Sequence, residues 1–321
     1  MISRHALLVL LAAGAAALTH PAAAQDGPIK LLLGYPAGAS SDTLSRLVAD
    51  KMRVSLGQPV IVENKAGAGG RIAAEELKAA APDGRTMMLA PVAVTAIFPS
   101  SFGNLRYDAF TDFAPVAHLA NFQIGFGVSA KLGVKTLKDY VALVKRDPNA
   151  AFYASAAPGS LPHFFGVMFA QAAGIKLIHV PYKGTANAMQ ALASGEIAAA
   201  STVVADLKTV EKSGKAYTLA ASGSQRPLAF PDVPTFKELG YNIEGYGWYA
   251  LWVPAHTPPA VIERLSQAAI AAIKSPELHE RLTTMGLEPT GYGPAELARI
   301  QREDFEKWAP IIKASGFKPG G

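Results

Sequence analysis

The sequence predicts an α/β protein with two similar lobes, each a mostly parallel sheet flanked by helices. Three observations support this fold class. Short apolar runs alternate with amphipathic segments, the order of elements starts again midway along the chain, and 321 residues suffice for about two domains. Strands separated by such helices favour right-handed βαβ units, which build parallel sheets with helices on both faces.

The first half begins with a predicted strand over residues 29–33. This strand ends at the small-residue turn 35–38, and an amphipathic helix follows over 42–56, with Gly57 as its stop. The remaining predicted elements of this half are a strand over 60–62, a helix over 71–80 and a strand over 87–89.

The second half repeats this order of strand, turn, helix, strand, turn and helix. Its predicted elements are helices over 137–144, 164–173 and 186–193, and strands over 152–154, 177–180, 197–200 and 217–220. The tail over 258–317 is predicted to be almost entirely helical, because Pro258, Pro259 and Pro294 stand at helix starts. The repetition favours two similar lobes over one large sheet.

The N-terminus has the pattern of a secretory signal peptide over residues 1–24. Arg4 precedes a run of 13 apolar or small residues over 6–18, and the small residues 22–24 precede a cleavage point before Gln25. The run is too short to span a bilayer. We therefore expect a soluble protein exported to the bacterial periplasm.

Composition and motifs exclude several functional classes. The chain has no cysteine, which excludes a disulfide scaffold, a cysteine zinc site and a thiol enzyme. The net charge of +5 comes from dispersed lysines and arginines, so we expect no nucleic-acid partner. The sequence contains no nucleophile elbow, zinc-protease motif or phosphate-binding P-loop. We expect no enzymatic activity, no cofactor and no metal.

Two turns of small residues stand between a predicted strand and a predicted helix. One covers 35–42 in the first half, and the other covers 156–163 in the second half. Backbone N–H groups and the positive end of a helix dipole favour an anion at such a position, and Ser40, Ser41 and Ser160 add hydroxyl donors. The alternative is plain helix capping, since Ser and Asp are preferred N-caps.

An enzymatic alternative uses the same second turn. Ser160 and His163 are three residues apart, so a hydrolase or lyase could use them as nucleophile and base. No orienting acid stands near them in the sequence.

Several longer sequence segments resemble those of the Bug family, the periplasmic solute-binding receptors of tripartite tricarboxylate transporters. The resemblance extends in order through the whole chain after the leader. The segments that carry it are 35–38 with Asp42, 57–70, 81–86, 179–184, 231–235 and 254–259.

The resemblance implies a two-lobe periplasmic-binding-protein fold, the Venus flytrap, that closes on a small organic acid. We expect a first lobe of residues 25–125 and 223–321 and a second lobe of 126–222, with crossings near Gly125 and Gly223. The ligand-binding residues expected from the turns and the resemblance are Tyr35, Gly38, Ala39, Ser40, Ser41, Asp42, Pro91, Val92, Ser155, Ala156, Gly159, Ser160, His163, Tyr182 and Thr202.

Departures from the family pattern bear on the ligand. Pro91 removes one backbone donor, and Val92 replaces a polar contact, in a loop that is rich in Gly and Ser in relatives. Ala198 and Thr202 stand where relatives often have Asp, and the loss of the second acid argues against an amino-acid ligand. The sequence therefore predicts a pocket for a monocarboxylate or aromatic acid rather than a citrate-like polyanion.

The resemblance also implies partners. We expect a monomer that delivers its carboxylate to the membrane components of a tripartite tricarboxylate transporter. A sensor that reports the ligand to a membrane signalling partner would have the same sequence features, so this alternative stays open.

Overall fold

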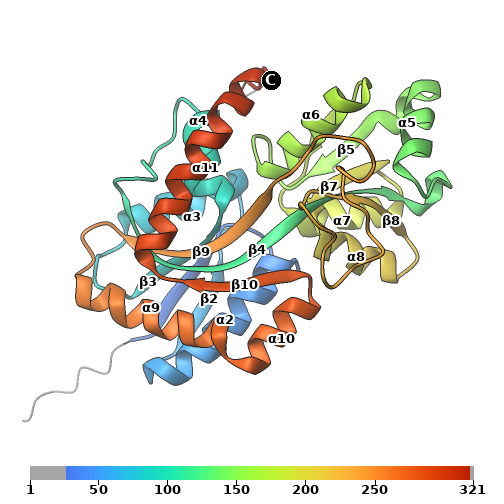
Figure 1. Cartoon of the computed structure of the whole chain (residues 1–321). Coiled ribbons are helices and arrows are strands. Elements are labelled where there is room, and N and C mark those ends of the chain that lie inside the picture. The colour runs from blue at the N-terminus through green and yellow to red at the C-terminus, as the bar shows by residue number, and fades with distance from the viewer. Residues whose placement is uncertain (1–26, 319–321) are drawn as a thin grey trace, which may run out of the picture.

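A curled ten-stranded sheet with helices on both sides connects the two lobes of the protein (Figure 1). The computed structural model describes residues 27–318, so the predicted signal peptide over 1–24 lies outside the described residues. The two-lobe α/β fold confirms the predicted fold class.

Three parallel strands form the outer part of the first lobe, in the order β2-β1-β3. The elements of this part are β1 (Ile29–Leu33), α2 (Ser40–Leu56), β2 (Val60–Asn64), η1 (Ala68–Gly70), α3 (Arg71–Ala79), β3 (Thr86–Pro91), η2 (Ala93–Ile97) and α4 (Phe98–Ser101). The predicted strands and helices of the first half are all present. α3 and α11 lie on one side of this sheet, and α2 and α9 lie on the other (Figure 1).

The second lobe repeats the arrangement, since its parallel strands follow the order β6-β5-β7 with the first strand in the middle. Its elements are η3 (Ala130–Leu132), α5 (Leu137–Arg146), η4 (Pro148–Ala151), β5 (Phe152–Ser155), α6 (Leu161–Ala173), β6 (Ile178–Pro181), α7 (Thr185–Ser194), β7 (Ala199–Val203), α8 (Val204–Lys212) and β8 (Ala216–Ala221). β1 and β5 therefore occupy equivalent positions, and each is followed by one of the two predicted turns.

A single long strand, β4 (Phe113–Ser129), belongs to both halves of the sheet. Its residues 113–123 pair with the antiparallel strand β9 (Tyr246–Pro254), and its residues 124–128 pair with β7. β4 is not among the strands predicted from the sequence. Its side chains are buried along almost the whole length, so no alternation of apolar and polar residues marks it as a strand.

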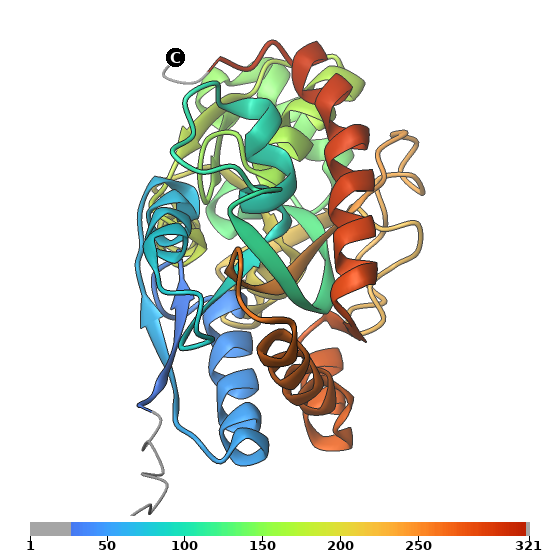
Figure 2. The same ribbon diagram turned by 90° about the vertical axis from the view of Figure 1, so that its left-hand side faces the viewer.

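The C-terminal part returns to the first lobe. It comprises α9 (Pro259–Lys274), α10 (Pro276–Thr284), β10 (Leu287–Tyr292) and α11 (Pro294–Ala314). β10 pairs antiparallel with β4, so the expectation of an almost entirely helical tail was too simple. Figure 2 shows α11 running along the molecule toward the second lobe. Beyond it, the Phe317 ring lies 5.8 Å from Phe102 and 5.6 Å from Phe164, centroid to centroid.

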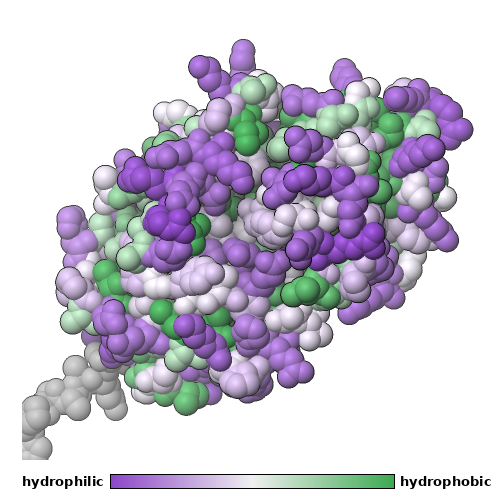
Figure 3. Space-filling model, viewed as in Figure 1, coloured by the Kyte–Doolittle hydropathy of each residue, from purple (hydrophilic) through white to green (hydrophobic). Residues whose placement is uncertain are grey.

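The largest hydrophobic core extends through both lobes, from Trp252 in β9 to Phe126 in β4 and Phe169 in α6. On the face shown in Figure 3, hydrophilic residues cover most of the surface and apolar residues form small separate groups. Within residues 27–318, none of the helices has both the length and the apolar character needed to cross a membrane.

Candidate functional site

A cavity lies between the lobes, at the ends of β1, β3 and β5. From the first lobe, Tyr35, Ser41, Pro91, Val92, Ala93, Phe122 and Tyr249 line it, and from the second lobe Ala156, Ser160, Leu161, Pro162, Thr185, Thr202 and Val203. The carboxyl ends of parallel strands are where α/β proteins usually bind ligands. Both predicted turns therefore contribute to one cavity.

Three helical segments begin at this cavity. Ser41 lies in the first turn of α2, Ala93 starts η2 and Leu161 starts α6. In the described part of the chain, the amide N–H groups of these three residues have no acceptor. Unpaired N–H groups at helix starts favour an anionic guest. The cavity thus offers main-chain donors from both lobes.

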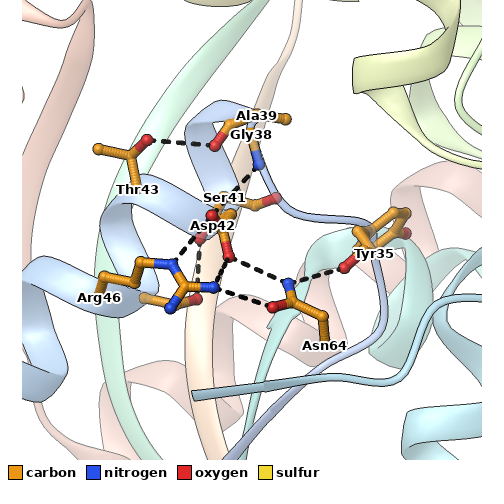
Figure 4. Close-up of polar contacts among 9 residues, drawn as sticks. Tyr35, Gly38, Ala39, Ser41, Asp42, Thr43, Arg46 and Asn64 are labelled. Carbon is orange, nitrogen blue, oxygen red and sulfur yellow. Dashed lines mark hydrogen bonds and ion pairs between the residues drawn. The ribbon is translucent and has the colours of Figure 1, made fainter. Parts of the chain in front are cut away.

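The first loop is held in shape by Asp42 (Figure 4). Its carboxylate accepts hydrogen bonds from Arg46 Nε at 3.1 Å, Arg46 Nη2 at 2.9 Å, Asn64 Nδ2 at 3.0 Å and the Gly38 N–H at 3.2 Å. Burial alone would raise the pKa of Asp42, but these hydrogen bonds outweigh it and lower the pKa below its usual value. Asp42 therefore fixes the loop, and its carboxylate is already fully engaged.

Tyr35 is also fixed by the loops around it. Its hydroxyl donates to the Gly69 carbonyl at 2.8 Å, and its own carbonyl accepts from Asn64 Nδ2 at 3.0 Å. Gly34, just before it, lies so close to Gly70 that a Cβ there would stand 2.4 Å from the Gly70 Cα. The ring of Tyr35 is thus held against the cavity by backbone contacts.

The second loop is organised by two stacked histidines. The rings of His163 and His179 are 4.0 Å apart, and His163 Nδ1 accepts the Gly159 N–H at 3.0 Å. His179 Nε2 lies 2.7 Å from Ser155 Oγ. Burial lowers the pKa of His163 to about 4, and burial with the neighbouring His163 lowers the pKa of His179 to about 3. Both rings are therefore neutral at pH 7 and support the loop.

The structure does not join Ser160 and His163 as nucleophile and base. Ser160 Oγ donates to the Ala157 carbonyl at 2.7 Å, while His163 Nδ1 is occupied by Gly159. Among residues 27–318, no group of three His, Asp or Glu side chains could hold a metal ion.

The predicted site residues fall into three groups. Tyr35, Ser41, Pro91, Val92, Ala156, Ser160 and Thr202 line the cavity. Gly38, Ala39 and Ser40 line a neighbouring groove with Asp206, and Tyr182 lines a second groove on the Tyr35 side. Asp42, Ser155, Gly159 and His163 do not line the cavity and instead shape the two loops.

Several cavity residues were not predicted, notably Phe122, Thr185 and Tyr249. Phe122 and Tyr249 lie on β4 and β9, and their rings are 4.5 Å apart. The pairing of β9 with β4 and β3 brings Tyr249 to the cavity. Thr185 lies 3.5 Å from Thr202, oxygen to oxygen, at the start of α7.

Among residues 27–318, no charged side chain lines the cavity, and the polar side chains that line it carry hydroxyl groups. A buried acid, Asp206, lies in the adjoining groove and accepts hydrogen bonds from the Ser40 N–H at 2.9 Å and from Ser40 Oγ at 3.0 Å. Recognition of a charged ligand in this cavity therefore depends on backbone dipoles and hydroxyl groups.

Residues 44–317 match the family described as tripartite tricarboxylate transporter family receptor. This chain belongs to that family. A Cupriavidus necator relative, the UPF0065 protein in the gbd 5′ region, is 35% identical, with 90% of this chain and 88% of the relative covered. The Bordetella pertussis protein BugT is 31% identical, with 96% and 94% covered. The resemblance to the Bug receptors is confirmed.

Two solved structures share the fold of this receptor closely. A Rhodopseudomonas palustris protein with adipate has a TM-score of 0.87 and 26% identity, with 91% of this chain and 98% of that chain covered. MatC from the same organism, with bound malate, has a TM-score of 0.84 and 27% identity, with 89% and 99% covered. The family and these neighbours are solute-binding receptors rather than enzymes, so the hydrolase alternative falls away.

Proposed function

We propose that this receptor captures a small monocarboxylate or aromatic acid between its lobes in the periplasm and delivers it to a tripartite tricarboxylate transporter. The observation behind the ligand class is the cavity itself. Amide N–H groups at three helix starts suit one carboxylate, while Val92, Phe122 and Leu161 suit an apolar body.

Closure follows from where these groups stand. Ser41 and Ala93 belong to the first lobe and Leu161 to the second, so a carboxylate that reaches all three makes contacts only the closed state provides. Ligand binding then shifts the population toward the closed receptor. The sensor alternative would use the same closure, and no contact in the structure favours it.

We also propose the division into lobes. The predicted second crossing is near Gly223, but the contacts of the following segment favour a crossing nearer Tyr246. The Phe236 N–H donates to the Ala221 carbonyl at 2.9 Å, and its ring lies 5.7 Å from Phe169 in α6. Residues 224–245 therefore go with the second lobe in this proposal.

Isothermal titration calorimetry tests the ligand class. The mature receptor is refolded to remove trapped ligand and titrated with hexanoate, benzoate, malate, citrate and glutamate. We expect the two monocarboxylates to bind and citrate and glutamate to bind weakly, because the residues among 27–318 that line the cavity include no cationic side chain to neutralise further carboxylates. Benzamide is the control for the carboxylate charge. Tight citrate or glutamate binding without monocarboxylate binding would contradict the proposal.

A further inference from the structure

Asp206 joins the two lobes at the edge of the cavity. It lies in the first turn of α8, in the second lobe, and its carboxylate binds Ser40 at the start of α2, in the first lobe. Both residues are buried, Asp206 with 9% of its surface exposed and Ser40 with 5%. The carboxylate is therefore held inside the interface between the lobes.

This carboxylate takes the position that an anion would take at α2. The N-cap residue of α2 is Ala39, whose side chain offers no cap to this 17-residue helix. Asp206 instead accepts the Ser40 N–H, which is one of the free donors at the helix start. One of the anion-binding donors of the first lobe is thus already used by the protein.

No cation neutralises Asp206 in the described part of the chain. Lys208, two residues further along α8, forms ion pairs with Glu211 at 3.2 Å and Asp232 at 2.8 Å instead. Burial raises the pKa of Asp206 to about 6, against the lowering effect of the two hydrogen bonds from Ser40. The carboxylate is consequently a poorly compensated negative charge near neutral pH.

Asp206 is close enough to the cavity to affect its ligand. Ser41, beside Ser40, lines the cavity, and the Tyr249 hydroxyl, also at the cavity, lies 3.4 Å from Ser40 Oγ. Thr185 lines both the cavity and the groove that contains Asp206. The pair Ser40–Asp206 therefore lies in the groove that adjoins the cavity.

We propose that Asp206 is a specificity-determining residue that restricts the ligand to a single carboxylate. A second carboxylate extending toward α2 would meet a like charge and a donor that is already occupied. This inference rests on the proposed function, since it assumes that the cavity takes carboxylates.

The test compares hexanoate with adipate, which share a six-carbon chain and differ by one carboxylate. Calorimetry at pH 7.5 measures both with the wild-type receptor, Asp206→Asn and Asp206→Ala. Asp232→Asn is the control, because it also removes one negative charge from the second lobe but lies on the exposed side of Lys208. Circular dichroism and thermal melts establish that each variant is folded.

We expect the wild type to bind hexanoate roughly tenfold more tightly than adipate, and both Asp206 variants to reduce that ratio severalfold. Asp232→Asn should keep the wild-type ratio. An unchanged ratio in Asp206→Asn overturns the inference while the proposed function stands. Wild-type preference for adipate overturns the inference and also the monocarboxylate class of the proposed function. If neither acid nor benzoate binds any of the proteins, the proposed function fails and this inference fails with it.

Discussion

Asp42 is the residue whose removal should most clearly show how the first loop is held. Asp42→Ala deletes a carboxylate that accepts hydrogen bonds from Arg46, Asn64 and Gly38. The Arg46 side chain is 50% exposed, so solvent screens this ion pair and it contributes only about 0.5 kcal/mol. The hydrogen bonds from the two neutral donors contribute about 1 kcal/mol each. We expect a loss of roughly 2–3 kcal/mol in the free energy of unfolding.

The assay is thermal unfolding followed by circular dichroism at pH 7.5, where this loss corresponds to a melting temperature lower by about 3–5 °C. Asp50→Ala is the matched control, because Asp50 lies exposed on the same helix and no described residue binds its side chain. It should change the free energy of unfolding by less than about 0.5 kcal/mol.

The pH dependence gives a second readout of the same contacts. The pKa of Asp42 lies below its usual value in the folded protein. Its contribution is therefore present at neutral pH and is lost as the pH falls from the ordinary aspartate pKa through the lower pKa of the folded protein, where the carboxylate takes up a proton. The melting temperatures of the wild type and Asp42→Ala should converge there. An Asp42→Ala variant as stable as Asp50→Ala at pH 7.5 would refute the reasoning.

Two further predictions concern the cavity loops. In Gly34→Ala the new Cβ would collide with the Gly70 backbone, so we expect the free energy of unfolding in guanidinium to fall by about 1–3 kcal/mol. Gly103→Ala is the control, because a Cβ there has free space, and it should unfold like the wild type. Equal stability of the two variants would contradict the close contact between Gly34 and Gly70. Burial lowers the pKa of His179 to about 3, so the stability that the neutral ring contributes above pH 6.5 is lost as the pH drops toward 4. His179→Phe should therefore reduce the fall in melting temperature over this range. His279→Phe is the control, because His279 lies on the exposed face of α10 and its removal should leave that fall unchanged. An identical acid profile in both variants would show that the His179 ring is not the cause.

Local sequence patterns predicted the repeated units well. One unit consists of β1, α2 and β2, and the other of β5, α6 and β6. In each unit the signals are local: the spacing of apolar residues and the glycine or proline at the turn lie within the segment that they predict. Local sequence therefore predicts the turns after β1 and β5, while their meeting in space depends on the packing of the two lobes.

Residues whose role depends on distant pairing were harder to predict. In the sequence, Asp42 looks like any acidic residue in the first turn of a helix. Its hydrogen bonds from Asn64 and Gly38, which exist only in the folded chain, show that its carboxylate faces the loop. Asp206 lies 166 residues from Ser40, so nothing local indicates their contact. Tyr249 reaches the cavity only through the pairing of β9, which no periodicity within that strand reveals.

The long strand β4 makes the two lobes mechanically continuous. Its first part completes the sheet with β9 and its last part completes the sheet with β7 and β8, so one backbone supplies hydrogen bonds to both lobes. Cutting the chain there would leave each half with an unpaired strand edge, which is a template for aggregation. Both lobes therefore depend on one shared strand, and we expect neither half to stay soluble when it is expressed alone.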